Sequence, residues 1–452
     1  MESEVARVLT DKISHRTLRL AVLGSGYVGL PTAALFAEAG FNVTAIDLND
    51  AIVEKISNGD SPIREPGLKE LVFDYVQKRK LKAVSFSKAI FSKEDCVVIS
   101  VQTPIDTNKK PDLSFLMNAV RRVGENLRRD MLIVVCSTLP PNTLSRKVKP
   151  LLESSSDLVA EADFCLAYVP ERIAPGKALR EMVENTRLVG GVGPYSGAVA
   201  ADLFKTICKN VVVTDAVTAE VAKLSENTFR SINIAFANEL ALLCEEYGAD
   251  VTKVVALANT HPRVKIHSAG PGAGGPCLTK DPYLLVDGAL TPTEDLVGPA
   301  GLINNFMPHH VVELVLQGLK CAKKTVRGSR IAVLGAAYKG DIGDSRSSPS
   351  EPIVRELMSL GSKVVVFDPF CKVSFGGISS NSVFEAVKDA NCVIVVTDHT
   401  VFRELNLWQL KELMIDRPVL VDCRRILDPS GAEQVGFYYY GVGYGKSLKC
   451  DS

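Results

Sequence analysis

One cysteine of this chain lies where a thiol could do chemistry, at the end of a glycine-rich loop. Residues 270–277 read Gly-Pro-Gly-Ala-Gly-Gly-Pro-Cys, and Asp281 follows four residues after Cys277. Because glycine lets a backbone approach a ligand closely, this loop predicts a thiol that is presented to a substrate. The alternative is a buried cysteine in a turn, which is the state expected for most of the 11 cysteines.

A polar stripe on a predicted helix precedes this loop. Lys223, Asn227 and Arg230 are spaced i, i+4 and i+7, so they share one helix face. A solvated face is the ordinary interpretation of such charges. However, asparagine is unfavourable inside a helix unless its amide has a partner, which favours a functional stripe. A lysine beside the cysteine would activate the thiol and stabilise an oxyanion.

A dinucleotide fingerprint stands near the start of the chain. The apolar run 18–23 leads into Gly-Ser-Gly-Tyr-Val-Gly at 24–29 and then into a predicted helix. The first glycine permits a tight turn, the second admits a pyrophosphate, and the third lets the helix pack on the strand. The cofactor contacts predicted here are Gly24, Gly26, Tyr27, Val28 and Gly29.

An acidic residue completes this fingerprint. The next predicted strand, 42–46, delivers Asp47 at its carboxyl end. Its carboxylate can bind the ribose hydroxyls of NAD and would repel the 2′-phosphate of NADP, so the sequence predicts NAD.

A second, weaker fingerprint lies near residue 335. The predicted strand 330–334 leads into Gly-Ala-Ala-Tyr-Lys-Gly, which lacks the middle glycine. No Gly-Lys-Ser/Thr follows, so this loop is not a P-loop. A nucleotide-shaped ligand other than a second NAD and a purely structural sheet are both open at this point.

The order of predicted elements gives the domain plan. Strands alternate with helices over about 15–214, an uninterrupted helix follows over 218–247, and the α/β pattern restarts near 330. We therefore expect two Rossmann-like doubly wound domains joined by a long central helix and a helical middle region. Their predicted bounds are 1–214 for the domain with the NAD fingerprint, 215–324 for the helical region with the cysteine loop, and 325–452 for the second Rossmann-like domain.

Composition excludes several classes of protein. The 52 basic and 52 acidic residues balance, which gives no support for a nucleic-acid or membrane-surface partner. Residues 1–17 lack the apolar core of a signal peptide, and no apolar run is long enough for a membrane span. The scattered cysteines and the absence of a Cys-x-x-Cys or histidine cluster predict reduced thiols, a cytoplasmic protein and no metal site.

These motifs together resemble the UDP-glucose/GDP-mannose dehydrogenase family. The match covers nearly the whole chain in order, and it rests on GSGYVG at 24–29, TP at 103–104, STLPP at 137–141, VPERIAPGKAL at 169–179, AEVAKLSENTFRSINIAFANEL at 219–240, HPRV at 261–264, GPGAGGPCLTKDP at 270–282 and YKGDIGDSRSSP at 338–349.

Two of these motifs resemble one branch of the family. Pro-Glu-Arg-Ile at 170–173 and the His-Pro-Arg-Val motif resemble the branch that acts on N-acetylated sugars, above all UDP-N-acetyl-D-mannosamine. The UDP-glucose branch usually has Pro-Glu-Phe-Leu, with a second acid where this chain has Pro175. The N-acetyl branch often has histidine where this chain has Pro276, so UDP-glucose and UDP-N-acetyl-D-glucosamine stay open as substrates.

The resemblance implies a four-electron oxidation of a sugar C6 hydroxyl to a carboxylate with two NAD+. Lys223, or a water between Lys223 and Asp281, would be the first base. Cys277 would capture the aldehyde as a thiohemiacetal, whose oxyanion Lys223 and Asn227 would stabilise. After the second hydride has left, Glu171 or Asp281 would activate the water that hydrolyses the thioester.

The resemblance also implies the remaining contacts. Thr138 would position the water or the nicotinamide, and the cofactor would further meet Thr103 and, from the second Rossmann-like domain, Arg346. A homodimer is implied, because His261 and Arg263 would serve the neighbouring subunit. The resemblance further implies dimerisation through 215–324, UDP-sugar binding by 325–452 and a role in polysaccharide biosynthesis. The residues expected to contact substrate are Glu171, Arg172, Lys223, Asn227, Arg230, His261, Arg263, Gly274, Tyr338, Lys339 and Arg424.

Two alternatives belong to other functional classes. One is a two-electron NAD-dependent hydroxyacid dehydrogenase, of the 3-hydroxyacyl or 6-phosphogluconate type, which also has a long helix. The other is a non-catalytic NAD-binding regulator. Neither needs a nucleophilic cysteine, so two NADH per substrate would separate them from the leading prediction.

Overall fold

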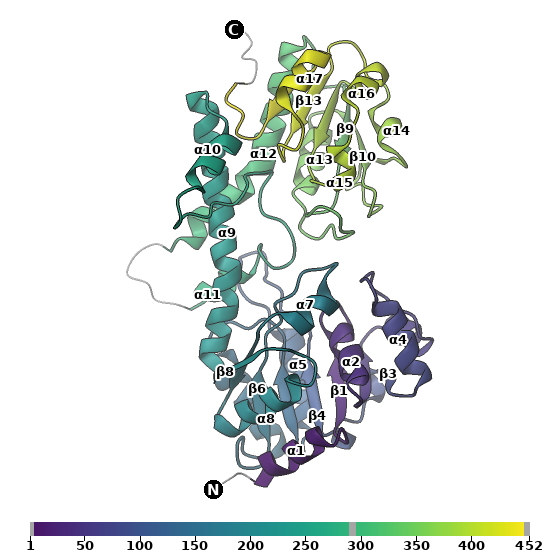
Figure 1. Ribbon diagram of the computed structural model, residues 1–452, viewed down its shortest axis with the longest axis vertical. Coiled ribbons are helices and arrows are strands. Elements are labelled where there is room, and N and C mark those ends of the chain that lie inside the picture. Colours follow the sequence, from purple (N-terminus) through teal and green to yellow (C-terminus); the bar gives the residue numbers. More distant parts are fainter. Residues whose placement is uncertain (1–3, 289–294, 447–452) are drawn as a thin grey trace. The chain divides into compact units, whose positions relative to one another are not determined.

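The computed structural model describes residues 4–288 and 295–446 (Figure 1). These residues form two compact units. The first holds the chain up to Glu226 together with Tyr283–Asp287, and the second holds Asn227–Pro282 and the chain from Gly288 onward.

The first unit is built on an eight-stranded sheet with the order β3-β2-β1-β4-β5-β6-β7-β8. Its strands are β1 (Arg19–Leu23), β2 (Asn42–Asp47), β3 (Leu81–Ser85), β4 (Cys96–Ile99), β5 (Leu132–Val135), β6 (Cys165–Tyr168), β7 (Arg187–Gly191) and β8 (Val211–Asp215). All neighbours are parallel except β6 and β7, which pair antiparallel. The sheet is therefore mixed at one end.

Helices cover this sheet and connect its strands. They are α1 (Glu4–Ser14), α2 (Gly29–Glu38), α3 (Asp50–Ser57), α4 (Leu68–Gln77), α5 (Ser114–Gly124), α6 (Lys149–Ser156), α7 (Ala178–Glu184) and α8 (Pro194–Phe204), with short turns η1 (Phe86–Lys88), η2 (Phe91–Lys93) and η3 (Leu144–Val148). Strands β1, β4, β5 and β6 are apolar and almost fully buried, as expected for parallel strands covered on both faces.

The N-terminal helix α1 was not predicted from the sequence. Val5, Leu9 and Ile13 are spaced i, i+4 and i+8, and all three are buried in the core beside α8. This amphipathic stripe, in a segment without the continuous apolar core of a signal peptide, is the local signal for α1.

Helix α9 (Ala216–Tyr247) confirms the predicted long helix and runs without interruption for 32 residues. It carries Lys223 in the first unit and Asn227, one turn later, in the second. The helices that follow are α10 (Val251–Ala258), α11 (Asp281–Val286) and α12 (Val297–Cys321).

The second unit contains a six-stranded parallel sheet with the order β11-β10-β9-β12-β13-β14. Its strands are β9 (Arg330–Leu334), β10 (Lys363–Phe367), β11 (Ile378–Ser379), β12 (Cys392–Val395), β13 (Val419–Asp422) and β14 (Tyr438–Gly441). Its helices are α13 (Ser350–Ser359), α14 (Val383–Val387), α15 (Thr400–Arg403), α16 (Leu407–Leu413) and α17 (Pro429–Val435).

The prediction of two Rossmann-like units with a long central helix is confirmed, although β3, β11 and β14 were missed. Within the described residues, no helix is long and apolar enough to cross a bilayer. No group of three metal-ligating side chains occurs there either. The expectation that all thiols are reduced is wrong at Cys321, which is disulfide-bonded.

Candidate active site

The loop between β1 and α2 has the geometry that its three glycines predict. Gly24 has a φ of +93°, and a Cβ there would overlap the carbonyl oxygen of Ser100. A Cβ on Gly29 would overlap the carbonyl oxygen of Gly24, whereas a Cβ on Gly26 would meet nothing within 4 Å. Two glycines thus close the turn, and the middle one leaves room for a phosphate group to approach the backbone.

Asp47 lies beside this loop at the end of β2. One carboxylate oxygen accepts the backbone N–H of Ser25 at 2.8 Å, and the other accepts the N–H of Asn49 at 2.9 Å. The carboxylate is therefore fixed between the glycine loop and the start of α3, where the fold places the adenosine ribose of a dinucleotide.

Asp47→Asn is expected to weaken NAD+ binding by about 1.5–3 kcal/mol, the usual contribution of a hydrogen bond to a charged group. NADP+ should lose less, because the same change removes the repulsion of its 2′-phosphate. Titration calorimetry with both cofactors measures the ratio. The assignment of Asp47 to the ribose fails if the ratio of the two affinities stays constant.

The turns that follow β4 and β5 are hydrogen-bonded to each other. The hydroxyl of Thr103 donates to the carbonyl oxygen of Thr138 at 2.8 Å. The Ser137 hydroxyl donates to the carbonyl oxygen of Val101 at 2.7 Å and accepts its N–H at 2.9 Å. The structure therefore brings the predicted cofactor residues Thr103 and Thr138 together at the carboxyl ends of adjacent strands.

Glu220 is a functional candidate that sequence reasoning missed. Its side chain is fully buried, and its two oxygens accept the N–H groups of Asn142 at 2.6 Å and Leu144 at 2.8 Å. Burial raises the pKa of this carboxyl to about 7. Glu220 thus ties the segment after Thr138 to helix α9, one turn before the buried Lys223.

Glu171 forms a buried ion pair with Arg187, another residue missed from the sequence. Both side chains are at most 8% exposed. Burial opposes the charge of the guanidinium, but the Glu171 carboxylate raises the pKa of Arg187 above its ordinary value. The other oxygen of Glu171 accepts the backbone N–H of Arg172 at 2.9 Å.

The Arg172 side chain also has partners within the protein. Its guanidinium donates to the carbonyl oxygen of Thr186 at 2.7 Å and pairs with Glu226 at 2.6 Å. A guanidinium has five N–H donors, so donors remain for a ligand.

In the second unit, Asn227 and Asp281 are joined directly. The Asn227 amide donates to one carboxylate oxygen of Asp281 at 2.7 Å, and Lys280 pairs with the other at 2.8 Å. Asp281 is fully buried, whereas Cys277 is exposed. The Asp281 N–H also donates to the carbonyl oxygen of Cys277 at 2.9 Å, so the thiol and the carboxylate belong to one turn.

The glycine loop before Cys277 packs closely against Tyr338. A Cβ on Gly274 would lie 2.7 Å from the Cβ of Tyr338, and a Cβ on Gly275, whose φ is +89°, would lie 2.7 Å from its ring. Arg424 donates to the carbonyl oxygen of Tyr338 at 3.3 Å and flanks Gly270. The predicted substrate residues Gly274, Tyr338 and Arg424 are therefore neighbours in the second unit.

Four other predicted substrate residues of this unit are exposed, and one of them, Lys339, directly follows Tyr338 in the chain. Arg230, His261, Arg263 and Lys339 are surface residues, and His261 and Arg263 contact each other at 3.5 Å. Arg346, the predicted cofactor contact, forms a two-point ion pair with Asp344 at 2.6 and 2.9 Å.

Two asparagines inside α9 hold the loops of this region. Asn233 binds the backbone of Lys265 and His267, each at 2.8 Å. Asn238 is fully buried, and its amide oxygen accepts the N–H of Gly270 at 2.9 Å. The signal that could have found them is the same as for Asn227, an asparagine inside a helix that needs a partner.

In the second glycine loop, which begins at Gly335, backbone N–H groups bind a carboxylate of the protein itself. Asp368, at the end of β10, accepts the N–H groups of Ala336 and Ala337 at 2.7 and 2.9 Å, and His399 contacts it at 3.0 Å. Although burial acts in the opposite direction, these hydrogen bonds hold the pKa of Asp368 well below its usual range. The arrangement parallels that of Asp47 and Ser25 in the first unit.

Family models match three consecutive parts of the chain. The NAD binding domain of the UDP-glucose/GDP-mannose dehydrogenase family matches residues 18–230, its central domain 217–304, and its UDP binding domain 332–429. The chain belongs to this family. Membership confirms that it is an NAD-dependent nucleotide-sugar dehydrogenase, with NAD as its cofactor.

Similar proteins include members of the N-acetyl branch. UDP-N-acetyl-D-mannosamine dehydrogenase of Pyrococcus horikoshii is 38% identical over 95% of this chain and all of its own, and its solved structure has a TM-score of 0.89. NDP-N-acetyl-D-galactosaminuronic acid dehydrogenase of Ralstonia nicotianae is 36% identical over 92% of this chain and 98% of its own.

A member of another branch has the same fold. The solved structure of a UDP-glucose dehydrogenase from Pyrobaculum islandicum is 27% identical, covers 94% of this chain and 98% of its own, and has a TM-score of 0.83. Fold alone therefore does not separate the substrates.

Proposed function

We propose that this enzyme oxidises the C6 hydroxyl of UDP-N-acetyl-D-mannosamine to a carboxylate, the uronate that polysaccharide biosynthesis uses. The observation that carries the proposal is the single turn that joins Cys277 to the buried Asp281–Asn227 pair. The names of the relatives support the sugar. UDP-glucose and UDP-N-acetyl-D-glucosamine are the alternative substrates. We further propose the three-part division at residues 214 and 324, and a cytoplasmic location.

In the first half-reaction, Lys223 takes the C6 hydroxyl proton, directly or through a water that it shares with Asp281. NAD, bound at the 24–29 loop with Asp47, Thr103 and Thr138, supplies the hydride acceptor in each half-reaction. Lys223 suits the role of base because it is only 7% exposed and lies one helical turn before Asn227, the partner of Asp281.

In the second half-reaction, the Cys277 sulfur adds to the C6 aldehyde and forms a thiohemiacetal. Lys223 and Asn227, one helical turn apart on α9, stabilise its oxyanion. Loss of the second hydride leaves a thioester on Cys277. Water then adds to the thioester carbon, and the Cys277 sulfur departs with a proton, so that two NAD+ and water together account for the four electrons and the second oxygen.

Asp281 is our choice for the base that activates this water, because it lies in the same turn as the sulfur. Glu171 is the alternative. Both oxygens of Glu171 accept hydrogen bonds, from Arg187 and from the backbone of Arg172, and both oxygens of Asp281 are likewise bonded, by Asn227 and Lys280. The turn shared with Cys277 therefore decides the choice.

The UDP group would lie against the second unit, at Tyr338, Lys339, Arg424 and the loop at Gly274. Arg230 would contact the sugar nucleotide, His261 and Arg263 would serve the site of the neighbouring subunit, and Arg346 would reach the cofactor. The uncommitted donors of Arg172 would bind the acetamido carbonyl, since Arg172 replaces the phenylalanine expected in the UDP-glucose branch.

UDP-N-acetyl-D-mannosamine is expected to yield two NADH per sugar, with UDP-glucose at least about tenfold poorer in kcat/KM. UDP-glucose lacks the acetamido oxygen and so forgoes a hydrogen bond to the half-buried Arg172 guanidinium, and a bond to a charged group contributes about 1.5–3 kcal/mol. Absorbance at the NADH band measures both values. Arg172→Met should bring the two substrates closer, and equal or better turnover of UDP-glucose by the wild type would reassign the enzyme to that sugar.

We also propose a homodimer that forms along α9. Phe229, Phe236, Leu243 and Tyr247 are spaced i, i+7, i+14 and i+18, and each is at least 38% exposed. Such a contiguous apolar stripe is typical of a protein–protein interface. A second copy of the chain would cover it and would bring His261 and Arg263 to the neighbouring site.

A further inference from the structure

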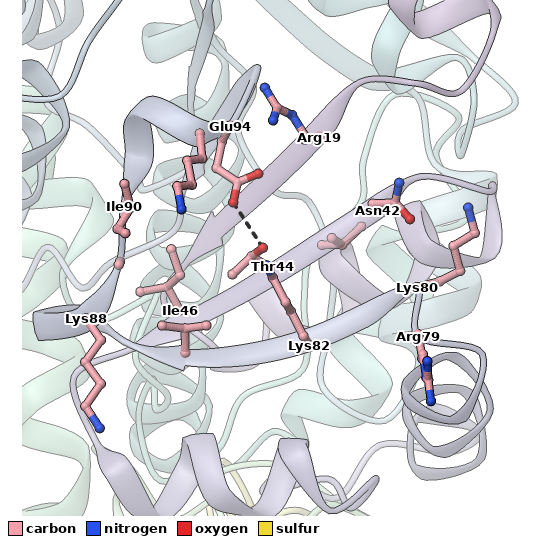
Figure 2. Close-up of a pocket in the computed structure, with 14 residues that line it drawn as sticks. Arg19, Asn42, Thr44, Ile46, Arg79, Lys80, Lys82, Lys88, Ile90 and Glu94 are labelled. Atoms are coloured by element: carbon pink, nitrogen blue, oxygen red, sulfur yellow. Dashed lines mark hydrogen bonds between the residues drawn. The ribbon is translucent and has the colours of Figure 1, made fainter.

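A cationic hollow opens on the first unit, beside strands β2 and β3 (Figure 2). Strand β3 connects to β4 through the short turns η1 and η2 rather than through a helix. This connection forms one wall of the hollow, and the face of β2 and β3 forms the other. The cavity has a volume of about 470 Å³, within the range of small-molecule sites.

The charges that line this hollow are strongly unbalanced. Six of its residues are basic and one, Glu94, is acidic, although the chain as a whole has a net charge of zero. The basic residues come from separate segments of the chain and are Arg19, Arg79, Lys80, Lys82, Lys88 and Lys93.

Two of these cations already have partners. Arg19 pairs with Asp95 at 3.1 Å, and Lys80 donates to the carbonyl oxygen of Gly40 at 2.9 Å. Asp95 also binds Lys12 and Arg128, so it adds no spare negative charge to the hollow. In the described part of the chain, the other four cations form no ion pair.

Glu94 does not neutralise those four cations. It accepts the hydroxyl of the buried Thr44 at 3.2 Å, the contact that Figure 2 shows as a dashed line. Burial raises the pKa of this carboxyl above its usual value. Six basic residues against one acidic residue leave the site net positive even with Glu94 ionised, so a ligand would meet a cationic surface.

Part of the lining, which we call the floor, is apolar. Ile90 of the connection is 51% exposed and Val84 of β3 is half-buried, whereas Ile46 and Ala89 are buried beneath them and offer little surface. A hydrated inorganic ion would gain nothing from this surface. A molecule with a chain of phosphates and a flat, partly apolar group would use both the cations and the floor.

We propose that this hollow binds a nucleoside di- or triphosphate at a site separate from the one for the cofactor. Lys82, Lys88 and Lys93 would hold the phosphates, and Ile90 and Val84 would contact the nucleoside. The hollow runs along β2 from Asn42 to Ile46, but its lining includes neither Asp47 nor a residue of the 24–29 loop. The inference does not depend on the identity of the sugar substrate.

Titration calorimetry of the full chain with ATP and with inorganic tripolyphosphate tests the proposal, with NAD+ and UDP at saturation to occupy the family's own nucleotide sites. We expect saturable one-to-one binding of both, tighter for ATP. Lys82→Glu/Lys88→Glu should weaken both by at least about tenfold, the effect of losing charge-assisted contacts. Ile90→Ser should reduce only the advantage of ATP.

The matched control is Lys253→Glu/Lys372→Glu, which reverses two equally exposed lysines of the second unit. This control should bind ATP as the wild type does. An equal loss in both double variants would mean a general charge effect and would overturn the site, as would the absence of saturable binding. Equal affinities for ATP and tripolyphosphate in the wild type would overturn the nucleoside contact.

Discussion

Cys277→Ser is expected to lower the rate of uronate formation by a factor on the order of 10³ or more, because a serine hydroxyl is a weak nucleophile at neutral pH. NAD+ affinity should stay nearly unchanged, since the residues proposed for the cofactor lie mainly in the first unit. Steady-state NADH formation and cofactor titration measure the two quantities.

Cys371→Ser is the matched control for this experiment. Cys371 also belongs to the second unit, but burial raises the pKa of its thiol to about 12, so it is a poor nucleophile. Its replacement should leave the rate nearly intact. A wild-type rate for Cys277→Ser would contradict the covalent mechanism. Loss of NAD+ binding in that variant would indicate that Cys277 has a structural role in the loop.

Arg187→Met is expected to lower the free energy of unfolding by about 3–5 kcal/mol, because it leaves the carboxylate of Glu171 buried without its counter-charge. Both partners are at most 8% exposed, and the space around Arg187 includes the ring of Phe204. Thermal and urea unfolding curves measure the loss.

A double variant separates charge from packing in this pair. Glu171→Leu/Arg187→Met removes both charges and should recover most of the stability, even though it removes a proposed active-site acid. Arg180→Met breaks an exposed pair with Glu184 on the surface of α7 and should leave the unfolding curve unchanged. A single variant as stable as the wild type would show that Glu171 finds another partner or takes up a proton.

Local signals predicted most of the fold. The fingerprint at 24–29, the apolar strands and helix α9 each follow from neighbouring residues, because turns, periodicity and glycine positions are short-range features. Strand β3 was missed because its exposed lysine and half-buried residues interrupt the apolar run expected of a parallel strand. Helix α1 was missed because its three buried residues, Val5, Leu9 and Ile13, are separated by charged and polar residues and form no apolar run.

The contacts inside the site were predicted less well, because they join residues far apart in the chain. Asn227 and Asp281 were named from motifs, but their hydrogen bond spans 54 positions. Glu220 and Arg187 carry no local mark that separates them from ordinary surface charges. Their importance follows only from burial and from partners that the fold supplies, Asn142 and Leu144 for one and Glu171 for the other.

The close fit of the glycine loop to Tyr338 bears on how substrate preference could be redesigned. Any side chain at Gly274 or Gly275 would meet Tyr338 within 2.7 Å, so the loop has no room to vary on its own. Diversity introduced there would be expected to disrupt the turn that carries Cys277 before it altered the sugar. Libraries should therefore start from smaller residues at position 338, and should change the glycines only in combination with them.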